Sequence, residues 1–169
     1  MPSVADGVVG VSAHVDLPLA DFRVGHRLRI ARDPAAAPGV ITEADARWPG
    51  RLRRIARATL LHWQRQGLLA AAERLLTTEE LLTTELVTNA LRHGSGPEID
   101  YRLHLTGTHV VTVVRDGSPE SPVLRQASLD DEHGRGLFLV DSMADAWGVS
   151  PDGTAIWCAL SYRDQPRSK

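Results

Sequence analysis

Hydrophobic positions recur at helical spacing in the first half of the chain. From Leu52 to Gln64, apolar or small side chains return every three to four residues. A Pro-Gly pair stands just before this segment and Gly67 stands just after it, as is common at helix ends. The pattern predicts an amphipathic helix that begins near Arg51.

A second helix is predicted from about Thr78 to Arg92. Thr77 or Thr78 can cap its start, because a threonine hydroxyl accepts from the unpaired backbone N–H groups of a first turn, and two glutamates follow. Gly94 can end the helix.

One face of this second helix is polar although its borders are apolar. At helical spacing, Glu85, Asn89 and His93 fall on the same face. The neighbouring wheel positions are leucines: Leu81, Leu82 and Leu86. The helix alone leaves two interpretations open, because the polar residues either face water, with His93 as a C-terminal cap, or gather around a ligand.

After residue 97 the period changes from helical to two. Residues 99–107 and 109–117 are predicted strands joined at Gly107-Thr108. A third helix is expected from Gly136 to about Ala146, and two more strands at 147–149 and 154–162. Because regular βαβ alternation is missing, we expect an α+β fold. It would be a two-layer sandwich whose mixed, mostly antiparallel sheet is covered on one face by about three helices.

The remaining segments define the expected domain limits. Residues 1–46 alternate short apolar patches with proline and glycine, which is typical of an extended or partly disordered arm, with one strand at Phe22–Ile30. The folded domain is expected at residues 47–163, and residues 164–169 form a polar tail. Residues 117–133 show little periodicity and are long for a loop, as in functional lids.

The composition fits one soluble domain. The chain has 169 residues, of which 43% are hydrophobic and 24% charged, values that exclude collagen-like, disulfide-scaffold and wholly disordered proteins. No apolar run approaches the ~20 residues of a membrane-spanning helix, and the start of the chain lacks the pattern of a secretory signal. The expected location is therefore the cytoplasm. The single Cys158 excludes an internal disulfide and a thiolate zinc cluster.

Positive charge is concentrated in one part of the chain. Residues 22–74 carry eleven arginines and four carboxylates. Clustered arginine gives affinity for nucleic-acid phosphates. The net charge of −2 and the pI near 6.4 argue against a dedicated nucleic-acid binder, and favour a solvated helix face or an acidic protein partner.

Two further groups carry candidate chemistry. Asp116 follows a strongly apolar strand and precedes Gly117, an arrangement that is also common in turns. The stretch His133-Gly134-Arg135-Gly136-Leu137 places two glycines at the start of a helix, where backbone N–H groups can face a phosphate. Neither a Walker A sequence nor a full dinucleotide fingerprint is present.

Three stretches, in this order, resemble the GHKL ATPase superfamily. ELVTNALRHG (85–94) resembles its N-box, VVRDGSP (113–119) its adenine-contacting box, and GRGLFLVDSMADAWGV (134–149) its glycine box with the following helix. The resemblance covers roughly residues 51–161. Within the superfamily the chain resembles the serine-kinase anti-sigma factors, and more closely the small ATP-binding regulators of actinobacteria. The resemblance implies the Bergerat ATP-binding fold.

The resemblance implies a role for each matching residue. Asn89 would bind Mg²⁺, Glu85 would be the catalytic base that orients or deprotonates the nucleophile, and Asp116 would accept from the adenine amino group. Gly134 and Gly136 would let the loop fold over the phosphates. The other nucleotide-binding residues implied are His93, Gly117, Arg135, Leu137 and Thr154.

Two positions depart from the family pattern. The adenine box usually reads D-x-G-x-G, whereas Gly117 comes one position early and the second glycine is replaced. The threonine that often supports the aspartate falls on Ala155, next to Thr154. Because strand neighbours face opposite sides, Thr154 can substitute only if the register bulges.

The resemblance implies a regulator of transcription that binds Mg-ATP. It would phosphorylate or sequester a protein partner, such as an anti-anti-sigma-like (STAS-type) protein or a sigma factor, as a serine/threonine kinase, and it would form a homodimer. The alternative is a non-catalytic protein-binding module whose shape depends on the nucleotide. Changing Glu85 separates the two, because only a kinase would lose phosphoryl transfer.

Overall fold

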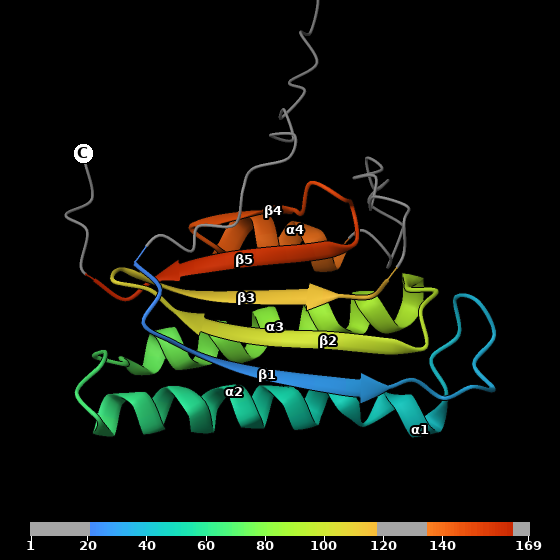
Figure 1. Ribbon diagram of the computed structural model, residues 1–169, viewed down its shortest axis with the longest axis horizontal. Coiled ribbons are helices and arrows are strands. Elements are labelled where there is room, and N and C mark those ends of the chain that lie inside the picture. The colour runs from blue at the N-terminus through green and yellow to red at the C-terminus, as the bar shows by residue number, and fades with distance from the viewer. Residues whose placement is uncertain (1–20, 118–134, 164–169) are drawn as a thin grey trace, which may run out of the picture.

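The computed structural model describes residues 21–117 and 135–163. Within them, five strands form one sheet in the order β1-β2-β3-β5-β4, and every neighbouring pair is antiparallel (Figure 1). The strands are β1 (Val24–Ala31), β2 (Glu98–Leu105), β3 (His109–Arg115), β4 (Ala146–Val149) and β5 (Ala155–Ser161).

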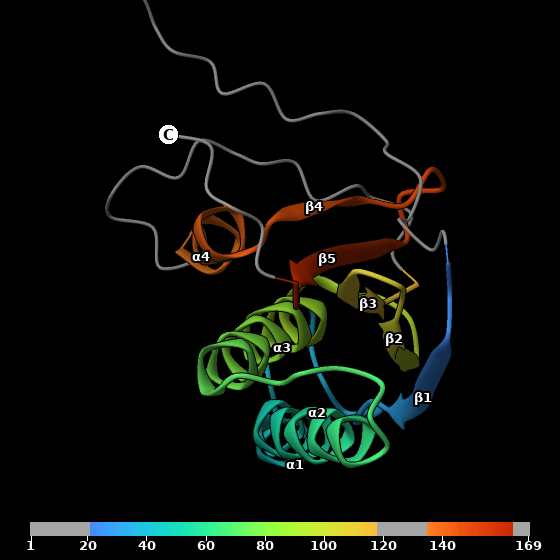
Figure 2. The same cartoon turned by 90° about the vertical axis from the view of Figure 1, so that its left-hand side faces the viewer.

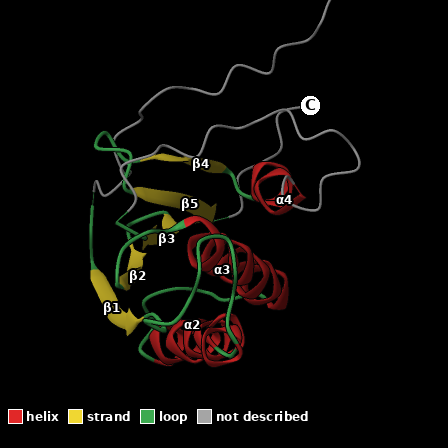
Figure 3. Ribbon diagram, turned by 90° about the vertical axis from the view of Figure 1, so that its right-hand side faces the viewer, coloured by secondary structure: helices red, strands yellow, loops and turns green. Residues whose placement is uncertain are grey.

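The described helices lie together on one face of the sheet, as Figures 2 and 3 show. They are α1 (Glu43–Ala46), α2 (Trp48–Arg65), α3 (Glu73–His93) and α4 (Arg135–Met143). The two long helices α2 and α3 pack side by side under the sheet, and α4 packs beside α3 near the β4 edge. The expected α+β two-layer sandwich is therefore confirmed.

The start of α3 differs from the prediction. The helix begins at Glu73, after the extended residue Ala72, so that Thr77 and Thr78 lie inside it and cap nothing. Leu75 and Leu76 are buried and extend the apolar stripe of the helix by one turn. Burial of these side chains outweighs the local capping preference of threonine, since packing of an apolar face supplies most helix stability.

The described part of the predicted arm belongs to the folded unit. Strand β1 pairs with β2 along its whole length, from Val24 opposite Leu105 to Ala31 opposite Glu98. The expected strand at Phe22–Ile30 is confirmed, with its start two residues later. The edge strand that precedes the helices is thus contributed by residues placed outside the expected domain limits.

The main core lies between the sheet and the helices. Alternate residues of β2 are buried toward α2 and α3, as the period of two predicted. Leucines of the helices meet them, including Leu60 on α2 and Leu82 and Leu86 on α3, which are almost fully buried. This packing fixes the position of α3, the helix that carries the candidate site.

The opposite face of the sheet has an apolar cluster of its own. Its members are buried, and they lie on β3 and β5: Val111, Val113, Ala155, Trp157 and Ala159. Because β3 is buried on both faces, its sequence HVVTVVR is a continuous apolar run instead of an alternating one.

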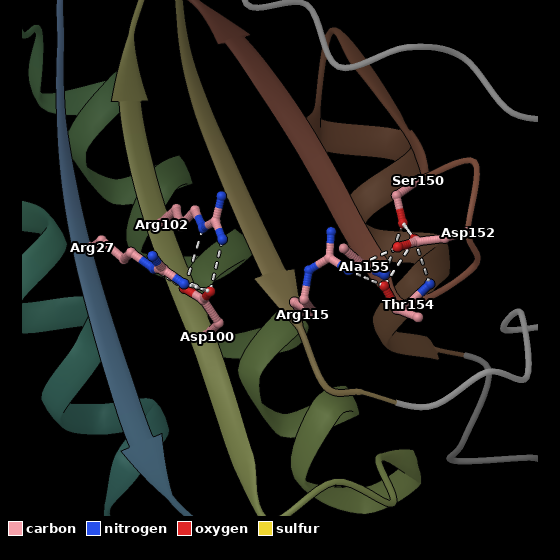
Figure 4. Close-up of polar contacts among 8 residues, drawn as sticks. All are labelled: Arg27, Asp100, Arg102, Arg115, Ser150, Asp152, Thr154 and Ala155. Atoms are coloured by element: carbon pink, nitrogen blue, oxygen red, sulfur yellow. Dashed lines mark hydrogen bonds and ion pairs between the residues drawn. The ribbon is translucent and has the colours of Figure 1, made fainter.

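A charged cluster lies beside it on β1 and β2 (Figure 4). Arg27 and Arg102 both donate to Asp100, at distances of 2.6 and 2.8 Å for the shortest N–O pairs. Partial burial alone would raise the pKa of Asp100, but the hydrogen bonds from Arg102 and Arg27 outweigh it and hold the pKa well below its usual range. The two arginines therefore keep Asp100 ionised.

Candidate functional site

The polar face of α3 lies at the border of the core. Glu85 and Asn89, one helical turn apart, are half-buried, whereas Leu82 and Leu86 beside them are buried. His93 is exposed and is the last residue of the helix, followed by the C-cap Gly94. The helix therefore presents a carboxylate and a carboxamide from a partly buried surface, on the shared face that helical spacing predicted.

Gly136 on α4 lies directly against Glu85. A Cβ atom added to Gly136 would be 2.7 Å from Oε2 of Glu85. Partial burial raises the pKa of Glu85, and the positive charge of Arg92 partly opposes the shift. The next residue, Leu137, is buried in the core and anchors the first turn of α4. Two of the three predicted stretches thus meet at one carboxylate.

Asp116 lies against the loop that follows α3. A Cβ atom on Gly94 would be 2.7 Å from Cβ of Asp116, and the backbone N–H of Gly96 donates to the backbone oxygen of Asp116 at 3.2 Å. Asp116 is half-buried, and Gly117 after it is exposed, with a φ of 71° that favours glycine. The adenine-contacting aspartate of the prediction is therefore fixed next to the end of the helix that carries Asn89.

Thr154 makes two kinds of contact, one through its side chain and one through its backbone. Its hydroxyl donates to Oδ1 of Asp152 at 2.8 Å and accepts from Arg115, in the network drawn in Figure 4. Its backbone oxygen accepts from the N–H of Asp116 at 3.2 Å. The register between β3 and β5 continues from Arg115 opposite Ala155 without a bulge. The contact of Thr154 with Asp116 is thus made by the backbone, and the hydroxyl belongs to the Arg115 network.

Asp152 is the acceptor at the centre of that network. It accepts from Ser150 at 2.5 Å and from Arg115 at 2.9 Å, as well as from Thr154. Hydrogen bonds from Ser150, Arg115 and Thr154 lower the pKa of Asp152 well below its usual value. The turn between β4 and β5 is in this way held against the end of β3, immediately before Asp116.

Part of the predicted glycine stretch lies outside the described residues. This holds for His133 and Gly134, and for the side chain of Arg135, whose backbone begins α4. Within the stretch 133–137, the structure therefore describes Gly136 and Leu137 in full.

Glu79 is a buried acid of α3, although the predicted start near Thr78 would place it in the first turn of the helix. Its side chain is 1% exposed, and its Oε1 accepts from the hydroxyls of Thr83 at 2.9 Å and Thr112 at 2.6 Å. Thr83 in turn contacts the hydroxyl of Tyr101 at 3.0 Å. Oε2 of Glu79 is buried without a hydrogen-bond partner among the described residues.

Burial raises the pKa of Glu79 to about 7, although the two threonine hydrogen bonds favour the charged form. The signal for this burial was present in the sequence, because position 79 lies on the same helical stripe as Leu75, Leu82 and Leu86 once the helix is begun at residue 73.

Residues 21–117 and 135–163 contain no group of three or more His, Cys, Asp or Glu side chains that could hold a metal ion. No helix in these ranges is long and apolar enough to cross a membrane.

Residues 46–160 match the histidine kinase-like ATPase domain in a comparison with known protein families. The chain belongs to this family. No curated protein is a significant match to the chain. The match includes α2, α3, α4 and the strands β2, β3 and β4, with β5 up to residue 160, and it contains every residue predicted for the nucleotide site.

Membership of the histidine kinase-like ATPase family makes ATP the expected ligand. The geometry of this ATPase domain fits such a ligand in three respects. A half-buried carboxylate and a carboxamide share the face of α3, the first turn of α4 comes within contact of the carboxylate, and Asp116 lies at the end of the same helix.

Proposed function

We propose that this domain binds Mg-ATP and transfers the γ-phosphoryl group to a serine or threonine of a protein partner, as the anti-sigma factor kinases do. The observation that carries the proposal is the contact between Gly136 and Glu85. It brings the N-terminal turn of α4, a favourable place for phosphate, to the acid that lies one turn from Asn89.

Asn89 is the protein residue that would hold the magnesium ion. Mg²⁺ usually takes few protein ligands beside substrate phosphates, so most oxygens around the ion would come from the triphosphate and water. Bound Mg²⁺ neutralises charge on the phosphates during transfer. A single carboxamide oxygen suits a hard cation that keeps several waters.

Glu85 would act as the base for the attacking hydroxyl. Partial burial raises its pKa and so increases its affinity for a proton, while Arg92 supports the ionised form that a base requires. The carboxylate lies where α3 meets α4, so a hydroxyl that hydrogen-bonds to it would stand close to phosphates bound at the start of α4. Positioning and proton acceptance would be its contribution.

Asp116 would select the base. A carboxylate accepts from the exocyclic amino group of adenine, whereas guanine has a carbonyl oxygen at that position and would repel it. The backbone contacts of Asp116 with Gly96 and Thr154 on either side hold the residue in place. Discrimination between ATP and GTP is therefore expected to depend on this residue.

The test compares the wild-type chain with Glu85→Gln. We expect the variant to bind ATP as before and to lose transfer of labelled phosphate to a partner captured from the host with ATP present. Glu80→Gln is the matched control, because Glu80 lies on the same helix and pairs with Arg57 at 3.2 Å, away from the site. Absence of ATP binding by the wild-type chain would refute the proposal.

The second candidate is a non-catalytic module whose partner binding depends on the nucleotide. It is favoured if the wild-type chain binds ATP, holds a partner more tightly with ATP than with ADP, and transfers no phosphate.

We propose a STAS-type protein or a sigma factor as the partner, and a homodimer as the assembled form. Size measurement with and without ATP tests the assembly.

Nucleic acid is not part of the proposal. Two arginines of the basic α2 helix contact other residues of the same domain. Arg57 pairs with Glu73 at 2.9 Å as well as with Glu80, and Arg51 lies 5.4 Å from the ring centroid of Trp48. A salt-sensitive shift of generic DNA in a gel would argue for the opposite view.

A further inference from the structure

Arg32 joins the N-terminal strand to the end of α3. The residue follows β1, and its guanidinium donates to the backbone oxygen of Leu91 at 2.8 Å, to that of Gly96 at 3.3 Å, and to that of Gly94. Its own backbone N–H donates to the oxygen of Pro97 at 2.9 Å. A single side chain therefore contacts the last turn of the helix and the loop that follows.

One of these carbonyl groups, that of Leu91, belongs to the last turn of α3, whereas those of Gly94 and Gly96 follow the helix. The last four carbonyls of an α-helix have no intrahelical donor, and a positive charge there also opposes the negative end of the helix dipole. Nε of Arg32 is buried with no acceptor among the described residues, and the three carbonyls accept from the two terminal nitrogens of the guanidinium. The fork shape of arginine allows one group to reach all three.

The loop held by Arg32 is the one that contacts Asp116. The N–H of Gly96 donates to the backbone oxygen of Asp116, and Gly94 leaves no space for a side chain between itself and Cβ of Asp116. The contacts run from Arg32 through Gly94 and Gly96 to Asp116. Movement of the loop would therefore move Asp116 relative to Asn89, which is fixed on α3.

We propose that Arg32 is a positioning residue for nucleotide selection, which sets the place of Asp116 relative to α3. This inference rests on the proposed function, in which Asp116 contacts adenine. Arg32 lies outside the residues matched to the ATPase family, 46–160, so the N-terminal strand supplies this support from beyond the matched domain. We expect the loss of Arg32 to weaken binding of the adenine base more than binding of the phosphates.

The experiment measures binding of ATP and of GTP to the full-length chain by calorimetry. We expect Arg32→Met to lower ATP affinity on the order of tenfold, with little change for GTP, because bonds to a charged donor are lost at the base side of the site. Arg29→Met is the matched control, since Arg29 is an exposed residue of β1, the strand that Arg32 follows. An unchanged ratio of ATP to GTP affinity in Arg32→Met would overturn the inference, as would an equal loss in the control.

Arg32→Lys separates positioning from stability. Lysine keeps the positive charge at the helix end but lacks the fork, so we expect it to restore thermal stability while the ratio of ATP to GTP affinity stays low. If lysine restores both together, or if both variants keep the wild-type ratio, Arg32 is only a helix cap. The lysine variant also carries the test if Arg32→Met does not fold.

Hydrogen exchange of the Gly96 amide, without nucleotide, keeps this test distinct from that of the proposed function. We expect slow exchange in the wild-type chain and in Arg29→Met, and faster exchange in both Arg32 variants. If the wild-type chain binds no ATP, the proposed function fails, and selection by Arg32 fails with it. Equal exchange in the wild-type chain, in Arg29→Met and in both Arg32 variants would instead show that Arg32 does not hold the loop at Gly96, whatever the result with ATP.

Discussion

Glu85 and Gly136 touch between α3 and α4, with only 2.7 Å from Oε2 of Glu85 to the position of a Cβ on Gly136. The atom that a new side chain would meet is the tip of a flexible glutamate. A methyl group there would therefore turn the carboxylate aside, and the backbone of either helix would not need to move.

Gly136→Ala is accordingly expected to impair chemistry more than stability. We predict unfolding free energy within about 1 kcal/mol of wild type, together with a fall in phosphoryl transfer of about tenfold or more, because the base is displaced. Transfer of labelled phosphate and chemical denaturation measure the two quantities. Gly50→Ala is the control, since nothing lies within 4 Å of a Cβ at this other helical glycine. Large unfolding of Gly136→Ala with normal transfer per folded molecule would contradict the prediction.

Gly94→Ala is expected to damage stability and ATP binding together. A Cβ atom there would lie 2.5 Å from the backbone oxygen of Ala90 and 2.7 Å from Cβ of Asp116, and neither atom can turn away. We predict a loss of about 1–3 kcal/mol in unfolding free energy and weaker ATP binding. The φ of Gly94 is −68°, so the penalty comes from space and not from backbone conformation. Ser95→Ala, at the exposed neighbouring position, is expected to behave as wild type in both denaturation and calorimetry.

Asp116→Asn is expected to reduce the preference for ATP over GTP. An amide can donate to the guanine carbonyl as well as accept from the adenine amino group, so ATP binding should weaken and GTP binding should improve. Calorimetry with each nucleotide measures the ratio. An undiminished preference for ATP would remove Asp116 from the base-contacting role.

Glu79 is expected to make stability fall as pH rises. Burial raises its pKa in the folded protein to about 7, above the ordinary value of 4.5, so its stabilising contribution is complete below pH 4.5 and is lost as pH rises through 7. The loss amounts to about 3 kcal/mol for a shift of this size. Denaturation at several pH values measures it.

Comparison with Glu79→Gln isolates this contribution. The variant carries no ionisable group at this position, so the difference in unfolding free energy between wild type and variant should shrink or reverse between pH 4.5 and 8. Glu80→Gln, at the partly exposed neighbour, should follow the wild-type curve. Parallel curves for wild type and Glu79→Gln would show that Glu79 is ionised in the folded protein.

The sequence predicted best what depends on local periodicity. The helical stripe of α2 and the alternation of β2 are repeated over many residues, and both elements are present in the structure. The first turn of α3 was missed because Leu75 and Leu76 are recognised as part of the stripe only when the core that receives them is known. The outer apolar cluster was missed for a similar reason, since β3 does not alternate.

In the candidate site too, features that follow local periodicity could be predicted, whereas contacts between distant parts of the chain could not. The shared face of Glu85 and Asn89 follows from helical spacing. The glycine turn was tied to the same site by the order of the three stretches that resemble the GHKL superfamily. Arg32 gave no signal, because it is separated from Gly94 by 62 positions and the contact is made to backbone oxygens, which every residue possesses. Thr154 was included among the nucleotide-binding residues through the family resemblance, and the contact of its hydroxyl with Arg115 on the neighbouring strand had no signal in the sequence.

The position of β1 matters for anyone who prepares a shortened form of this protein. A fragment cut at the family limit, residue 46, would lack β1 and leave the eight residues of β2 as a bare sheet edge. An open edge offers unpaired N–H and C=O groups to strands of other molecules and promotes aggregation. Such a fragment would precipitate or pair edge to edge even though every residue of the matched family is present.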